Sequence, residues 1–168
     1  MQARSIPLPF ALAALGPVAI GAIVAATSGT VTPLAATPAI VFGVLAVTAP
    51  ALYIAITAAG NAPSLAAIVR ALGTALGAFG MALAGLVLPA TFLALSAVTL
   101  GTTLAVATAA LATAGVIAMR RLHRELDAAR PPTVRTSWTS RCVFAVWAFA
   151  TLGIAADMWW SLATEVAS

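Results

Sequence analysis

Asp157 is the side chain in this 168-residue sequence with the clearest potential for chemistry, because it is the one acid inside a long apolar run. Ser161 and Thr164 follow it at spacings of four and three residues, which places the three side chains on one face of a helix. An acid inside a membrane span is a functional candidate by default, and it could bind and release a proton. We therefore expect this face to turn inward, toward a packed or hydrated seam.

The depth of Asp157 leaves a second interpretation open. The residue lies 16 positions beyond Arg141, which is about 24 Å of helix. In a hydrocarbon core of about 30 Å it is then nearer the outer interface than the midplane. There it could be an interfacial acid that forms hydrogen bonds near Ser161 and Thr164.

Scarce residue types exclude most other chemistry. All eight basic residues are arginine, so neither a lysine Schiff base nor a phosphate-binding Walker lysine can form. His123 and Cys142 are the only residues of their kinds, which excludes a bis-histidine haem, an HExxH zinc site and a CxxC redox pair within one chain. Serines and threonines are plentiful, but no base is placed to activate them. We expect no enzyme activity, no catalytic residues, no cofactor and no metal site.

The elements that must position these residues are membrane helices. Hydrophobic residues make up 62% of the chain and charged residues 7%, and the mean hydropathy is +1.10. Soluble domains have about 25% charged residues, so a soluble fold is excluded. We expect an all-α integral membrane protein, a multi-pass bundle in the inner or plasma membrane of a bacterium.

Apolar runs and turn residues predict five transmembrane helices in a single domain. The spans cover approximately 6–26, 34–59, 65–98, 103–119 and 142–163, and a hydrophilic, arginine-rich loop covers 120–141. The reversal between the third and fourth spans could lie near 89–91 or 99–103, and we favour the second because an exposed turn needs polar partners. A cleaved signal peptide is an alternative interpretation of the first run.

Arginine positions predict the topology. With five spans, Arg4, Arg70 and the loop arginines all fall on one side of the membrane, which is the cytoplasmic side by the positive-inside rule. The N-terminus is then cytoplasmic and the C-terminus outside. Trp138 at one end of the last span, and Trp159 with Trp160 near the other, are typical of interfacial aromatic belts.

A stripe of small residues on the third span predicts a helix-packing groove, because small side chains let helix backbones approach closely. The groove consists of Arg70, Gly73, Gly77, Gly80 and Ala84. Arg70 itself is either an anchor that reaches lipid phosphates or a functional cation in a hydrated cavity.

The hydrophilic loop predicts contacts with lipid headgroups. Its arginines are attracted to anionic lipids, and we expect no nucleic-acid partner because the positive-inside rule already accounts for such a loop. The expected headgroup contacts are Arg120, Arg121, Arg124, Arg130, Arg135 and Arg141.

Two functions fit these features. The first is a non-enzymatic subunit or accessory scaffold of a larger membrane assembly, with other membrane subunits or further copies of the same chain as partners. The alternative is a small transporter or channel that Asp157 could couple to protons. The sequence specifies no substrate, ion or partner.

Overall fold

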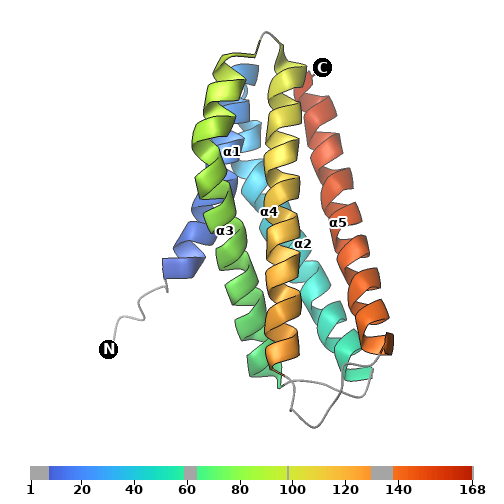
Figure 1. Cartoon of the computed structure of the whole chain (residues 1–168). Coiled ribbons are helices and arrows are strands. Elements are labelled where there is room, and N and C mark those ends of the chain that lie inside the picture. Colours follow the sequence, from blue (N-terminus) through green and yellow to red (C-terminus); the bar gives the residue numbers. More distant parts are fainter. Residues whose placement is uncertain (1–7, 59–63, 98, 130–137, 168) are drawn as a thin grey trace, which may run out of the picture.

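The structure, a computed structural model, describes residues 8–58, 64–97, 99–129 and 138–167, and for residues 8–12 it describes the backbone alone. Within these ranges the chain forms five α-helices and no strand. The helices are α1 (Leu8–Ser28), α2 (Thr32–Ala58), α3 (Leu65–Leu95), α4 (Leu100–Ala128) and α5 (Trp138–Ala167). They run along one elongated bundle (Figure 1), so the all-α bundle of five helices expected from the sequence is confirmed.

Four of the helices are suited to cross a membrane. The helices α2, α3, α4 and α5 are long enough and apolar enough to span a bilayer. The part of α1 whose side chains are described, Ala13–Ser28, is a shorter apolar helix. At 1.5 Å per residue the four long helices measure about 40 to 46 Å, which exceeds a hydrocarbon core of about 30 Å. The fold is an all-α bundle with four helices long and apolar enough to span a membrane, whereas the orientation of its termini stays a prediction.

Short turns with polar caps separate the helices. Gly29 ends α1 in the left-handed conformation, with φ of 73°, and its N–H donates to the carbonyl four residues earlier at 3.0 Å. Ser64 and Thr99 precede α3 and α4, and each side chain accepts an N–H of the first turn at 3.3 Å. The chain therefore turns back between Leu95 and Leu100, next to the favoured position near 99–103. The other expected position, near 89–91, lies inside α3 together with Pro89.

Neighbouring helices differ in how closely they pack. α3 packs extensively on both α1 and α4, and α2 packs on both α1 and α5. By contrast, α4 and α5 contact each other over little of their length, and Figure 1 shows the two diverging. The last helix is thus held mainly by α2, and the space beside α4 is left for the cavity described below.

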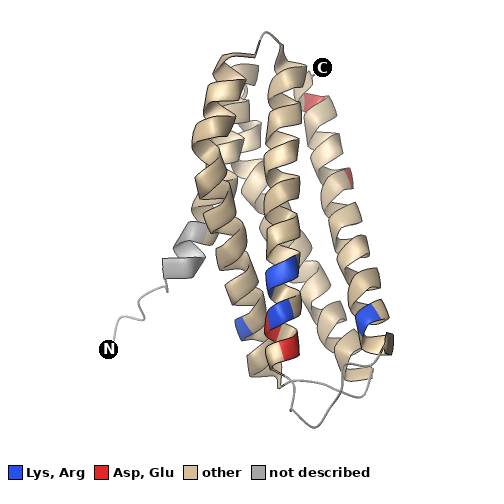
Figure 2. Ribbon diagram, in the orientation of Figure 1, with Lys and Arg blue, Asp and Glu red and all other residues tan. Residues whose placement is uncertain are grey.

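Charged side chains are segregated along the bundle. Figure 2 shows the described arginines gathered at the end where α3 and α5 begin and α4 ends. We call this the arginine end; its members are Arg70, Arg120, Arg121, Arg124 and Arg141. Asp157 and Glu165 instead lie in the second half of α5, toward the opposite end. Arg4, Arg130 and Arg135 lie outside the described residues.

Candidate functional site

The polar stripe of α5 lies on the outside of the bundle. Asp157, Ser161 and Thr164 are all exposed. Ser161 donates its hydroxyl to the Asp157 backbone carbonyl at 3.0 Å, and Thr164 donates to carbonyls of its own helix at 2.9 and 3.1 Å. Among the described residues no ion pair includes Asp157. Asp157 and Ser161 therefore face away from the other helices, opposite to the inward orientation expected from the sequence, whereas Thr164 also lines the cavity described below.

The side of α5 that packs on the other helices carries two tryptophans. The helix buries Trp147, Thr151, Trp159 and Leu162. Burial of the two indole rings removes much apolar surface from the surroundings and favours this packing, while Phe149 and Trp160 stay exposed. A Cβ added at Gly153 would have no neighbouring atom within 4 Å, so the side of α5 that carries Gly153 is open.

Two indole hydrogen bonds attach α5 to different neighbours. Trp147 donates Nε1–H to the backbone carbonyl of Thr48 on α2 at 2.8 Å. Trp159 donates Nε1–H to the hydroxyl of Thr108 on α4 at 2.7 Å. The sequence interpretation of Trp159 as an interfacial residue missed this role, because hydropathy does not specify which of two adjacent tryptophans turns inward.

A cavity of about 1030 Å³ lies among α2, α3, α4 and α5, and it is partly open to the surroundings. Its wall on α5 extends from Trp147 to Ala167, with one or two residues from each helical turn, and it includes Trp160 and Thr164. Its wall on α4 extends from Gly101 to Leu122. Sequence reasoning missed this cavity, since it exists only because α4 and α5 are held apart.

The cavity wall is apolar except for threonine hydroxyls, most of which are already bonded. Thr37 donates to the Pro33 carbonyl at 2.8 Å. Thr108 donates to a carbonyl of α4 at 2.7 Å while it accepts the Trp159 indole. Thr151 differs, since its side chain is buried, with 6% of the residue exposed, and its hydroxyl has no hydrogen-bond partner in the part of the chain that the structure describes.

The predicted groove on α3 is partly filled by α1. Gly77 and Gly80 are buried and Gly73 is half-buried, whereas Arg70 and Ala84 are exposed. On α1, a Cβ added at Gly16 would lie 3.1 Å from the Gly80 carbonyl oxygen and 2.8 Å from the Leu83 Cβ. The centre of the stripe thus permits close approach of two helix backbones, and its ends face outward.

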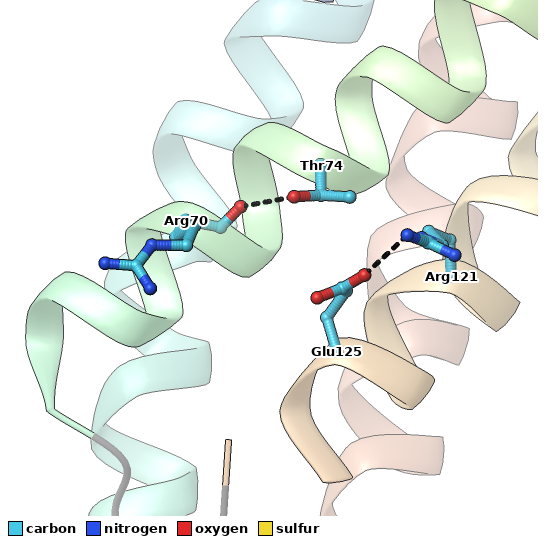
Figure 3. Close-up of polar contacts among 4 residues, drawn as sticks. All are labelled: Arg70, Thr74, Arg121 and Glu125. Atoms are coloured by element: carbon cyan, nitrogen blue, oxygen red, sulfur yellow. Dashed lines mark hydrogen bonds and ion pairs between the residues drawn. The ribbon is translucent and has the colours of Figure 1, made fainter. Parts of the chain in front are cut away.

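Arg70 points away from the bundle (Figure 3). Its backbone carbonyl accepts the Thr74 hydroxyl at 3.0 Å, and its guanidinium lies apart from the ion pair that Arg121 forms with Glu125 at 2.8 Å. This placement suits the anchor interpretation of Arg70, since a long side chain at a helix end can extend to the lipid headgroups.

A pair of stacked rings joins α4 and α5 at the arginine end. His123 stacks on Phe144 with ring centroids 5.0 Å apart, and its Nε2 lies 3.4 Å from an Asp127 carboxylate oxygen. Arg120, Arg124 and Arg141 are exposed, whereas Arg130 and Arg135 lie outside the described residues. No group of three or more potential metal ligands occurs within the described ranges.

Comparisons with known protein families, curated proteins and solved structures find no match for this chain. The geometry itself therefore carries the functional argument. It offers an outward polar stripe on α5, an apolar cavity beside α4 and a basic end.

Proposed function

We propose that the protein is a non-enzymatic subunit or accessory scaffold of a larger assembly in the cell membrane. The observation that carries this proposal is the outward orientation of Asp157, Ser161 and Thr164. A charged side chain on the outer surface of a membrane helix is costly unless a polar group or water reaches it. A neighbouring subunit that covers the stripe supplies such a group.

The surroundings of the stripe support the same proposal. α5 exposes large apolar side chains beside its polar residues, including Phe149 and Trp160. Aromatic residues beside a few polar groups are typical of the buried centre of protein interfaces. Because α5 packs chiefly on α2, most of its remaining surface is available to a partner.

The alternative function, a small transporter or channel, requires that several copies of the chain assemble. The cavity inside one chain has an apolar wall with no charged residue in it, so it offers no path for an ion. Several copies that assemble around α5 would instead bring Asp157 from each copy to a central path, where it could carry protons.

Site-specific cross-linking tests the proposed function. Because the chain has no lysine, the cross-link is best made from Ser161→Cys in a Cys142→Ser background, with Leu93→Cys on α3 as an exposed control. We expect Ser161→Cys to cross-link to one partner in native membranes, and Leu93→Cys to give no such product. Native mass spectrometry in mild detergent should then show a complex of fixed stoichiometry with a second protein.

Two results would contradict this function. A chain that remains monomeric in both measurements is not a subunit. The second is a closed homo-oligomer that conducts protons and loses this conduction in Asp157→Asn. That result identifies the channel of the alternative function.

A further inference from the structure

We propose that the cavity beside α4 is a binding site for a hydrocarbon chain of an anionic membrane lipid, whose headgroup lies at the arginine end. This inference does not depend on the proposed function, since it concerns the gap between α4 and α5 and makes no use of Asp157 or Ser161, which lie outside the cavity lining.

The chemistry of the wall indicates an apolar occupant. No charged residue lines the cavity, and the hydroxyls of Thr37, Thr108 and Thr164 are all used in hydrogen bonds within the protein. Leucine, valine, alanine and aromatic side chains form the rest of the surface. The unpaired Thr151 hydroxyl alone gives a polar solute little in exchange for its lost hydration, whereas a hydrocarbon chain has no such cost.

The length of the cavity places it alongside the lipid chains of the bilayer. Its wall on α4 extends over 22 residues from Gly101 to Leu122, which is about 32 Å and close to the thickness of a hydrocarbon core. With a volume of about 1030 Å³ it can admit a hydrocarbon chain from the adjacent bilayer, and the experiment below distinguishes that chain from a partner helix.

The route of entry is lateral. α4 and α5 contact each other little, and exposed alanines line the cavity on both of these helices. The stacked rings of His123 and Phe144 join the two helices near the arginine end. A lipid chain can therefore enter from the bilayer between α4 and α5, while the ring pair limits how far the chain can extend toward that end.

The charge at the arginine end specifies the headgroup. Arg120 lies one helical turn beyond Val116, a residue of the cavity wall, so the two occupy the same side of α4. Arg120 is exposed, and it has no ion pair within the described ranges. Its guanidinium is free to bind a lipid phosphate in two-pronged geometry. The occupant is accordingly a lipid with net negative charge.

Native mass spectrometry tests the site. The full chain is purified in mild detergent with equal amounts of phosphatidylglycerol, which is anionic, and phosphatidylethanolamine, which is zwitterionic. We expect the parent protein to retain phosphatidylglycerol at collision energies that remove detergent. The double substitution Ala112→Phe and Ala156→Phe fills the cavity from two exposed wall positions and should reduce retention at least about five-fold. Ala145→Phe, also exposed on α5 but outside the cavity, should retain lipid as the parent does.

Arg120→Gln tests the headgroup separately and leaves the cavity intact. We expect this variant to retain both lipids equally, whereas the parent prefers phosphatidylglycerol. Thr151→Val tests the occupant, because a hydrocarbon chain does not use the hydroxyl and should be retained as before.

Several outcomes would overturn the proposal. Equal retention in the filled double variant and in the parent means that the cavity holds no lipid, and an equal loss in Ala145→Phe means that the lipid is annular. Loss of lipid in Thr151→Val identifies a ligand with a polar group at mid-depth. If the double variant does not fold, as judged by circular dichroism and gel filtration, then unchanged lipid preference in Arg120→Gln is enough to reject the anionic lipid. If the parent retains a second protein and the filled double variant does not, the occupant of the cavity is a partner helix instead.

Discussion

Adjacent tryptophans on α5 have opposite roles. Trp159 is 8% exposed and donates its indole N–H to Thr108, whereas Trp160 is 69% exposed. Successive helical residues point about 100° apart, so a packed helix turns one of the pair inward and the other outward. The sequence indicated an aromatic pair near an interface, but it could not specify which ring forms the contact with α4, because that depends on how α5 is placed against its neighbours.

Removal of one indole N–H distinguishes the two tryptophans. Trp159→Phe keeps an aromatic ring but loses the hydrogen bond to Thr108, and we expect the free energy of unfolding to fall by about 0.6 to 1.5 kcal/mol. Trp160→Phe, the matched control, should change it by less than about 0.5 kcal/mol. Thermal unfolding in detergent measures both, and equal shifts would show that the Trp159 bond contributes nothing.

The charge of Asp157 has a separate test. Asp157→Asn keeps the size of the side chain and removes its negative charge, so it should fold like the parent but form several-fold less of the assembly proposed above. Gel filtration of protein extracted from native membranes at fixed concentration measures how much of the chain is assembled and how much is monomeric. Unchanged assembly together with lost proton flux would identify a proton carrier rather than an interface residue.

At the scale of elements, the sequence specifies helices better than it specifies their faces. Hydropathy and turn residues predict the five helices, because about 20 apolar residues are needed for each crossing and glycine, serine and threonine mark their ends. The small-residue stripe on α3 also lies partly against α1. The inward orientation expected for α5 was wrong for Asp157 and Ser161, which are exposed outside the cavity, whereas Thr164 lines the cavity. Polar and aromatic residues both recur at helical spacing on α5, and only the tertiary packing decides which of them turn inward.

Close approach of α1 and α2 depends on one glycine. A Cβ at Gly21 would overlap the backbone carbonyl oxygen of Pro33, which cannot move aside as a flexible side chain can, whereas Gly43 on α2 has no neighbour within 4 Å of an added Cβ. We expect Gly21→Ala to destabilise the protein by about 1 to 3 kcal/mol. Gly43→Ala should be neutral or stabilising by up to about 1 kcal/mol.

Thermal unfolding and the yield of monodisperse protein compare the two alanine variants. Equal tolerance would mean that α1 and α2 are farther apart than this structure places them.

At the scale of the whole molecule, segregation of the arginines predicts how the bundle lies in a membrane. The described arginines share one end, and the positive-inside rule assigns that end to the cytoplasm. A reporter that is active only outside the cytoplasm should be silent when inserted near Ala128 and active when fused after Ser168. The reverse pattern would invert the bundle, and equal activity at both sites would contradict a crossing of the membrane by α5, the one helix between them.

The same segregation predicts that trypsin cleaves the described part of the chain from one face alone. Trypsin cleaves after lysine and arginine, and this chain has no lysine, while each described arginine lies at the arginine end. In sealed vesicles of one orientation, protease added to the opposite face meets helix ends and a turn that contain no cleavage site among the described residues. Digestion from each side in turn therefore reports the orientation of an unmodified, untagged chain.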